Sequence, residues 1–535
     1  MKSHCYPFRE IPHSTQLFLD YLDFSGPVEP FYSRSPRFLE WAEDEVSRIR
    51  YPFERRRELA AIIERQNLGW GAGAKTLENI ARFRAGASAI VTGQQVGLFG
   101  GPAFSIYKAL TAVKLAAEAC ALGVECVPVF WLAAEDHDLA EVNQVEIPAA
   151  DLRLEALTSQ VESRKDAPVG TQSFGPEIAA AVGHLQELLG ESEWPAHVAE
   201  CYRPGENFGS AFAKLYSRLF AEYGVILLDG SDPELDRIAG PLYLTAVEES
   251  GEITRLLLGR NRELEAAGYH QQARVTESST LLFVVRDGAR VPVQAADAGE
   301  FLIGEEKLSR RELAELASCS PESLSPNVLL RPVVEDYLLP TLAYVGGAAE
   351  IAYFAQAGVV QGKLLGRTTP VVPRLSATIV EPKTQALLEK NRVAATDVFQ
   401  PPEALRELIG VRRLPPDLEA SFDRAAAAVE RSMQAVSGSL AELDKTLFES
   451  AENAKSKMLY QITNLRARAS RAELRQSEVI GRQADALSHS LYPEKTLQER
   501  KFAAIYFLAK YGREWMNGLY DAIHPDCLNH LIIEL

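Results

Sequence analysis

The segment that most narrows the possible folds of this chain lies near residue 100. Residues 89–92 (AIVT) form a short apolar run, which is typical of a buried strand. A glycine-rich loop follows at 93–104, then a predicted helix at 105–122 and a second apolar run at 124–132. Strand, loop, helix and strand in this order make a βαβ unit, whose two strands are parallel. We therefore expect an α/β fold with a Rossmann-like parallel-sheet core.

The most polar residues of this unit follow its two predicted strands. Gln94 and Gln95 lie in the glycine loop, and the second strand runs into residues 135–138 (EDHD). Ligands of parallel sheets bind at the carboxyl ends of the strands. We therefore expect both segments at one site.

The loop and the start of its helix predict an anion-binding site. Glycines let a backbone approach a ligand closely, and a helix N-terminus favours an anion. We assign Gln94, Gln95, Gly97 and Ser105 to substrate binding, although a tight strand-to-helix turn is the alternative. Lys108 opposes the helix dipole unless a phosphate or carboxylate binds nearby, so we count it as catalytic; a solvated surface lysine is its alternative.

Residues 135–138 combine three acids with one histidine, which suits a general base, a metal site or amine recognition. We assign catalysis to Asp136 and His137, and substrate binding to Glu135 and Asp138. The alternative is a cluster that caps a helix. No second histidine has a helical spacing that completes a zinc pattern, so we expect no metal.

A second glycine turn occurs at 344–353 (YVGGAAEIAY). Glu350 and Tyr353 lie one helical turn apart there, and Arg331 precedes them at the end of an apolar run. We assign all three to substrate binding, with a plain βα turn as the alternative.

These patterns divide the chain into six expected segments. They are a first core half with a helical lead-in (1–148), a first insertion (149–200), more core (201–250), a second, partly β insertion (251–325), the second core half (326–384) and a helical coiled-coil domain with short terminal helices (385–535). The second insertion should contain a hairpin, 280–286 with 290–294, around Asp287-Gly288.

The coiled coil is predicted from apolar or small residues at three- and four-residue steps between Phe422 and Ala469. A single helix of this length would extend roughly 70 to 80 Å, and a helical hairpin is the alternative. Because the apolar stripe must pack on something, we expect a homodimer.

Composition excludes several classes of function. The net charge of −17 disfavours nucleic-acid binding. No apolar run approaches the ~20 residues that span a bilayer, so we expect no membrane partner. The six scattered cysteines fit a reducing cytosol, and we expect a cytoplasmic protein.

Four segments together resemble one known family. VTGQQVGLFGGPAFSIYKA, FWLAAEDHD, NVLLRPVVEDYLLPTLAYVGGAAEIAYFAQ and LYPEKTLQER are similar to the BshC family of bacillithiol biosynthesis, over nearly the full chain. The resemblance implies a Rossmann-like core with two connecting-peptide insertions and a C-terminal coiled coil that dimerises. It also implies a carbon–nitrogen ligase that adds L-cysteine to the amine of glucosaminyl-malate.

The core also resembles class I aminoacyl-tRNA synthetases in layout. Their His-x-Gly-His signature is replaced by Ser-Ile-Tyr-Lys at 105–108, and no Lys-Met-Ser-Lys-Ser sequence is present, so ATP use stays open. For ATP or ADP we select Lys383, Gln498 and Arg500 as candidates in a second pocket. The rival hypotheses are a non-catalytic nucleotide-binding dimeric scaffold and a plain nucleotidyltransferase.

Overall fold

The computed structural model describes residues 1–535 except 162–165, 191, 297–298, 414–415 and 477. Its centre is a five-stranded sheet in the order β13-β12-β2-β3-β6, in which every neighbouring pair is parallel. The strands are β2 (Ser88–Gln94), β3 (Cys126–Leu132), β6 (Ile226–Asp229), β12 (Thr341–Gly346) and β13 (Val371–Pro373). The expected α/β, Rossmann-like core is confirmed.

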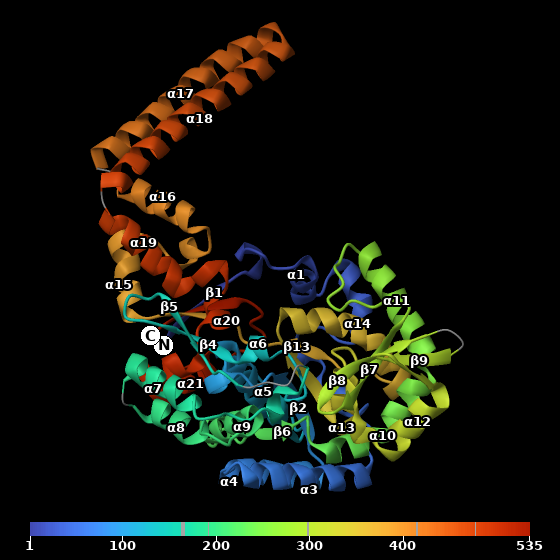
Figure 1. The fold of residues 1–535 in the computed structure, drawn as a ribbon. Coiled ribbons are helices and arrows are strands. Elements are labelled where there is room, and N and C mark those ends of the chain that lie inside the picture. Colours follow the sequence, from blue (N-terminus) through green and yellow to red (C-terminus); the bar gives the residue numbers. More distant parts are fainter. Residues whose placement is uncertain (162–165, 191, 297–298, 414–415, 477) are drawn as a thin grey trace.

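The order of these strands reverses between β2 and β12. From β2 the chain builds the sheet outward through β3 to β6, and later returns to the other side of β2 with β12 and β13 (Figure 1). Such a reversal opens a crevice beyond the carboxyl ends of the two central strands. The candidate site lies in this crevice.

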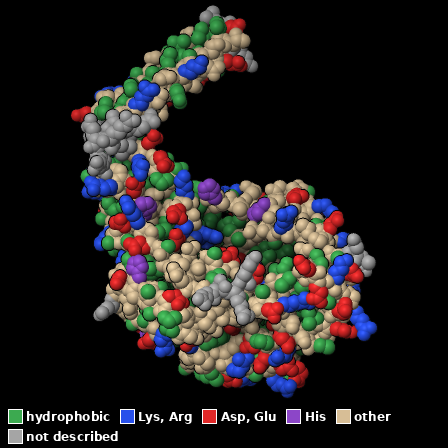
Figure 2. Space-filling model, in the orientation of Figure 1, with side chains coloured by type: hydrophobic (Ala, Val, Ile, Leu, Met, Phe, Trp, Pro, Cys, Tyr) green, Lys and Arg blue, Asp and Glu red, His purple; other side chains and the backbone are tan. Residues whose placement is uncertain are grey.

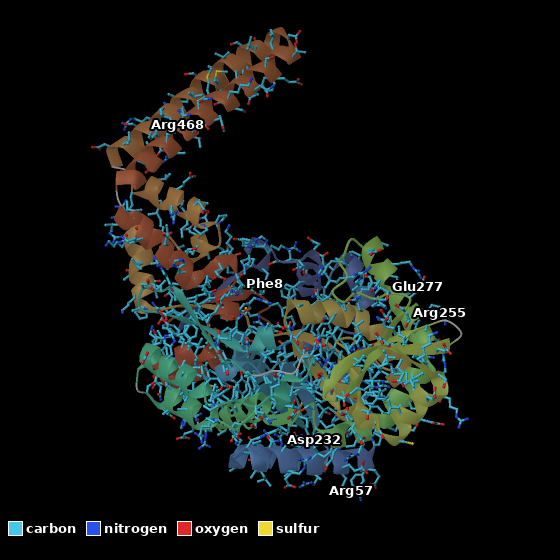
Figure 3. The ribbon with its side chains drawn as sticks, viewed as in Figure 1. Phe8, Arg57, Asp232, Arg255, Glu277 and Arg468 are labelled. Carbon is cyan, nitrogen blue, oxygen red and sulfur yellow. The ribbon has the colours of Figure 1, made fainter. Side chains whose placement is uncertain are left out.

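Helices cover both faces of the sheet, which explains why its strands are apolar without alternation. Val91 and Val129 join a core with residues of α3 (Phe53–Gly69), whereas Phe130 packs on the opposite face with α9 (Phe208–Leu219). In Figure 3, Asp232 lies on the inner side of α3 and Arg57 on its outer side. α5 (Ala103–Ala121), the helix that the sequence predicts, connects β2 to β3.

Two further sheets lie at the expected insertions but do not keep to their bounds. β4 (Gln144–Pro148), just before the first insertion, pairs with β5 (Leu154–Thr158) inside it. A five-stranded antiparallel sheet has the order β10-β9-β8-β7-β11, and β11 (Leu324–Pro326) crosses the end of the second insertion. The predicted hairpin is confirmed as β7 (Ser279–Arg286) and β8 (Ala289–Ala295). Its turn has positive φ at both Asp287 and Gly288, as a two-residue hairpin loop requires.

The expected coiled coil folds back on itself. α17 (Pro416–Leu443) and α18 (Lys445–Gln476) run side by side as an arm that projects from the globular body (Figure 1). Arg466 of α18 forms ion pairs with Glu419 and Asp423 of α17. The hairpin alternative is therefore the one observed; the side chain of Leu443 lies outside the described part of the arm.

Both ends of the chain differ from the expected helices. β1 (Lys2–Tyr6) pairs antiparallel with β15 (His530–Glu534), and β14 (Ala377–Val380) pairs parallel with β15. The terminal region does contain a helix, α21 (Ala504–Ala522), but its last segment is a strand. The expectation of short terminal helices is wrong there, because β15 is defined by pairing with partners more than a hundred residues away, which a local pattern does not reveal.

No helix among the described residues is long and apolar enough to cross a bilayer.

The first insertion supports the segment that carries residues 135–138. Gly170, in η5 (Val169–Thr171), donates its N–H to the Ala134 carbonyl at 2.9 Å. A methyl group on Gly170 would overlap the Ala134 Cβ and lie 3.0 Å from the Ala134 Cα and carbonyl oxygen, which are backbone atoms and cannot rotate away.

We predict that Gly170→Ala lowers the free energy of unfolding by ~1–3 kcal/mol through this overlap. Gly183→Ala is the matched control, because Gly183 lies in α7 (Ile178–Leu189) with open space around it. The control should stabilise by up to ~1 kcal/mol, as Gly to Ala does in a helix. Denaturant unfolding of both variants measures this, and equal midpoints would contradict the prediction.

Candidate functional site

A cavity of about 280 Å³ opens at the carboxyl ends of β2 and β12. Its walls come from the glycine loop, α13 (Arg331–Leu338), α14 (Ala348–Leu365) and the start of α20 (Gln498–Lys501). The space-filling view in Figure 2 shows a hollow in the globular body beside the base of the arm. Carboxylate and guanidinium groups share the wall. They are Asp136, Glu141, Glu335, Glu350, Arg331, Arg374 and Arg500.

A buried ion pair joins the two halves of the sheet behind this cavity. Lys108 of α5 is only 1% exposed, and its Nζ lies 2.8 Å from the carboxylate of Glu350 on α14. The same ammonium donates to the Gly93 carbonyl and, at 3.2 Å, to Gln94 Oε1. All three of its N–H donors are thus engaged. Burial lowers the pKa of Lys108 from its ordinary value, while Glu350 opposes that shift.

Lys108 is therefore no surface lysine. It is the sixth residue of α5, in the second helical turn rather than the first, and its partners are protein groups. Its position favours a role in holding Gln94 and Glu350 in place.

Glu350 is fixed from a second side. Its Oε2 accepts the N–H of Gly347 at 2.8 Å, which caps α14, and its Oε1 accepts the Tyr344 hydroxyl at 2.7 Å. Tyr353, one helical turn later, also lines the cavity. The second glycine turn thus presents both expected residues to the same space as Gln94 and Gln95.

Arg331 and Glu135 form a second ion pair beneath the site. Arg331 Nε lies 2.6 Å from Glu135 Oε1, although the two groups are not aligned as a hydrogen bond. Burial opposes a charge on Arg331, but Glu135 and its acidic neighbours raise the pKa of its guanidinium above the ordinary value. Glu135 is buried as the partner of Arg331, whereas Arg331 itself lines the cavity.

Glu335, one turn after Arg331, is a buried carboxyl at the cavity wall. It is 4% exposed, and its Oε2 has no hydrogen-bond partner. Burial raises the pKa of Glu335 to about 8; Arg331 opposes this shift, while the nearby Glu135 and Glu350 add to it. This carboxyl is therefore largely protonated at neutral pH.

Asp136 reaches the cavity as an ionised carboxylate. It accepts from Gln95 Nε2 at 2.9 Å and from the His137 N–H at 2.8 Å. Burial would raise the pKa of Asp136, but Arg331, these hydrogen bonds and Arg290 hold it below the ordinary value. The glutamine-containing loop and the acidic segment 135–138, which we expected at one site, do meet here.

His137 lies at the edge of this cluster, half-exposed. Its Nδ1 is 3.5 Å from Asp136 Oδ1 and 3.4 Å from a guanidinium nitrogen of Arg290. Arg290 belongs to β8 of the second insertion; its side chain is 2% exposed and donates to the Pro326 carbonyl at 2.8 Å. The second insertion thus supplies a cation to the site, which sequence reasoning did not select.

Two arginines form a basic cluster at the same cavity. Arg374, directly after β13, and Arg500 of α20 both lie over the ring of Phe104, at 5.1 and 5.8 Å from its centroid. Arg374 is ion-paired to the buried Glu499 at 2.6 Å. Burial and the charge of Arg374 lower the pKa of Arg500. In the described part of the chain no carboxylate lies within 4 Å of the Arg500 guanidinium, which suits it to an incoming anion.

The other expected residues have mostly structural surroundings. Asp138 caps α6 (Leu139–Val142) by accepting the Glu141 N–H, as its alternative interpretation held. Ser105 is buried in the first turn of α5. The amide of Gln498 is buried and bonds to the main chain at Ile379 and Ser490. Lys383 is exposed near the start of α15 (Pro382–Asn391).

The glycine loop is less open to an anion than its sequence suggests. The N–H groups of Gly97, Gly100 and Gly101 already donate to oxygen atoms of the protein. Three successive residues, Phe99 to Gly101, have positive φ, so the loop is a tight structure that bends back on itself. The arginine side chains are therefore better placed than the loop to bind an anion in this cavity.

Among the residues that the structure describes, no three His, Cys, Asp or Glu side chains cluster as metal ligands do.

We predict that Glu350→Gln lowers the free energy of unfolding by ~3–5 kcal/mol, because it leaves the Lys108 ammonium buried without a counter-charge. The matched control is Glu252→Gln, which breaks the partly exposed pair of Glu252 with Lys363. That control should cost much less, because solvent screens the exposed pair and Lys363 keeps its second partner, Glu249. Urea unfolding compares the two variants. Similar losses of unfolding free energy would contradict the prediction that the buried pair contributes more than the exposed one.

A second prediction concerns pH. Glu335 titrates near 4.5 when unfolded and near 8 when folded, so between these values the folded state binds more protons. Stability therefore falls as pH rises through this window. Glu335→Gln should remove that part of the decline. As the pH rises from 5 to 8, the unfolding free energy of the variant should therefore increase relative to that of the parent chain. Parallel curves of unfolding free energy against pH would contradict it.

Comparison with known proteins assigns a family to this arrangement. Residues 1–375 match the family model described as the N-terminal Rossmann-like domain of the bacillithiol biosynthesis protein BshC, and residues 377–535 match its C-terminal coiled-coil domain. Three similar proteins carry the name "Putative cysteine ligase BshC". The relative from Koribacter versatilis is 46% identical, with 99% of each chain covered. The relative from Solibacter usitatus is 36% identical over 99% of each chain, and the one from Salinibacter ruber is 32% identical over 97% of this chain and 96% of its own. The chain therefore belongs to the BshC family of bacillithiol biosynthesis.

Proposed function

We propose that this chain joins the carboxyl group of L-cysteine to the amine of glucosaminyl-malate, forming the amide bond of bacillithiol. The observation that carries the proposal is one cavity with two kinds of charged group. Arg374 and Arg500 provide a basic cluster, and Asp136 provides an ionised carboxylate. The proposed acceptor has the matching chemistry, since it carries both carboxylates and an amine.

Each cluster has a role in this proposal. Arg374 and Arg500 bind the malate carboxylates, because guanidinium groups recognise carboxylates in a bidentate manner. Asp136 faces the amine, and it accepts a proton directly or through His137 beside it. Glu350 and Tyr353 position cysteine from the opposite half of the sheet.

The reaction requires an activated acyl group, because an amide does not form spontaneously from a carboxylate and an ammonium in water. In this proposal ATP supplies the activation, giving an acyl phosphate with ADP or an acyl adenylate with pyrophosphate. The neutral amine then attacks the acyl carbon, the C–N bond forms, and phosphate or AMP leaves with the electron pair. Of the three candidate nucleotide residues, Arg500 is the one whose side chain lines this cavity.

The first prediction of this proposal is product formation. Purified protein with cysteine, glucosaminyl-malate and ATP should yield a thiol with the mass of bacillithiol, and omission of ATP should prevent it. Mass spectrometry identifies the product, and the accompanying AMP or ADP tells which activation occurs. Absence of the product under both conditions would contradict the ligase and favour the scaffold hypothesis.

The second prediction separates the roles of the residues. His137→Asn should abolish product formation, and Arg374→Gln should raise the KM for glucosaminyl-malate at least tenfold. Arg48→Gln is the control, since Arg48 is 61% exposed and does not line the cavity. Circular dichroism and denaturation midpoints check folding. Unchanged kinetics in the His137 variant would remove it from the mechanism.

We also propose that the arm forms a homodimer. Apolar side chains stay exposed on both of its helices, including Val436, Met458, Tyr460 and Leu465, and Figure 2 shows apolar side chains along its length. A second copy of the arm would cover them. Leu465→Lys should shift the mass in light scattering from dimer to monomer, whereas Glu449→Lys at another exposed position of the arm should not. A monomeric parent chain would refute the proposal.

A further inference from the structure

Two cysteines from opposite ends of the chain meet on the surface. The Sγ atoms of Cys5 and Cys527 lie 3.2 Å apart, although 522 residues separate the two positions. The sequence shows six scattered cysteines without a close spacing. The fold therefore brings together two cysteines that no sequence motif predicts to be neighbours.

Sheet pairing explains the approach. Cys5 lies in β1, opposite Leu531 of β15, and Cys527 lies in the turn that leads into β15, where its N–H donates to the His524 carbonyl at 2.9 Å. Figure 1 shows the two chain ends side by side on one flank of the globular body. Because both cysteines are anchored by main-chain hydrogen bonds, their proximity is a property of the backbone.

The pair is accessible to solvent. Cys5 is exposed and Cys527 is partly exposed; of the other four thiols, Cys126 and Cys201 are buried, Cys120 is partly exposed and Cys319 is exposed. A small reagent in solution can reach the Cys5 sulphur, and Cys527 lies directly behind it. This is the arrangement of an attacking thiol with a resolving thiol.

We propose that Cys5 and Cys527 are a dithiol modification site, which a low-molecular-weight disulfide converts into an intramolecular disulfide bond. This proposal is independent of the proposed function. A disulfide bond is ~2.0 Å long, so the two sulphur atoms need only a small side-chain movement to join.

The exchange balances in two steps. The Cys5 thiolate attacks one sulphur of the external disulfide, forming a mixed disulfide and releasing one thiolate. Cys527, after losing its proton, then attacks the Cys5 sulphur, forming the Cys5–Cys527 bond and releasing the second thiolate. The two protein thiols lose two electrons and two protons, and the external disulfide takes them up as two thiols.

The first step should be slow at neutral pH and accelerate as the pH rises. The hydrogen bond with Cys527, together with burial, raises the pKa of Cys5 to about 11. Only the thiolate attacks, so the rate of the first step grows roughly tenfold per pH unit below that value.

The Cys5–Cys527 disulfide would link β1 covalently to the segment that leads into β15, and β15 contacts residues behind the cavity. His530, three residues after Cys527, lies 2.8 Å from the Ser376 hydroxyl, and Ser376 donates to Glu499 at 3.0 Å. Glu499 is the ion-pair partner of Arg374. Oxidation therefore restrains β15. The first residue of β15, His530, is connected to Arg374 in the cavity wall through Ser376 and Glu499.

The test uses the full-length protein, reduced and then equilibrated with mixtures of oxidised and reduced glutathione. After acid quenching and alkylation, the intact protein should lack two hydrogens and carry two fewer alkyl groups. Peptide mapping should find the fragment with residue 5 linked to the fragment with residue 527. The oxidised protein should also unfold at a higher temperature than the reduced protein.

Three serine variants make the result specific. Cys5→Ser and Cys527→Ser should abolish the internal bond, and Cys527→Ser should retain a stable glutathione adduct on Cys5. Cys319→Ser is the control, because Cys319 is the other exposed cysteine, and it should oxidise like the parent chain. The proposal is overturned if the parent chain yields only glutathione adducts, no oxidation, or a disulfide that involves any other cysteine.

Discussion

The ion pair of Lys108 and Glu350 is the interaction on which the site depends. It connects the helix that follows β2 with the helix that follows β12, the two strands between which the order of the sheet reverses. The ammonium also donates to the main-chain carbonyl of Gly93 and to the side-chain amide oxygen of Gln94 at the end of β2, while the carboxylate accepts the Gly347 N–H and so caps the helix after β12. This buried contact therefore adds a side-chain link to the direct pairing of β2 with β12, and hydrogen bonds on both sides leave neither charge unpaired.

Around this contact, parts of the chain that are distant in sequence complete the wall. The second insertion contributes Arg290 beside Asp136 and His137, and the C-terminal region contributes Arg500 and the partner of Arg374. The first insertion supports the acidic segment through Gly170. The insertions and the C-terminal region are thus structural parts of the site, and a Rossmann-like core without them would lack Arg500 in the cavity wall and Arg290 and Glu499 behind it.

The sequence predicted the local units well and the long-range pairings poorly. The βαβ unit, the second glycine turn and the hairpin of the second insertion follow from apolar periodicity and turn residues, which act over a few positions. β1 and β15 did not follow, because each is a short segment whose strand partners lie far away in the sequence: β15 for β1, and β1 and β14 for β15. The same distinction applies to the site. Asp136, Gln95 and Glu350 were selected because they follow strands, whereas Arg290, Glu335 and Arg374 have roles that depend on burial and on neighbours from other segments. Lys108 was selected for an anion, and its partner is instead a carboxylate of the protein itself.

The return of the chain along the arm affects the order in which the site is assembled during synthesis. Because α18 returns along α17, the chain comes back to the globular body and adds α20 and β15, which supply Arg500, Glu499 and the partner of β1. During synthesis β1 can therefore pair with β15, and Arg500 can join Arg374 at the cavity, only after the segment that follows the arm has been made. A chain truncated in the arm would contain the whole parallel sheet but neither Arg500 nor the partner of Arg374.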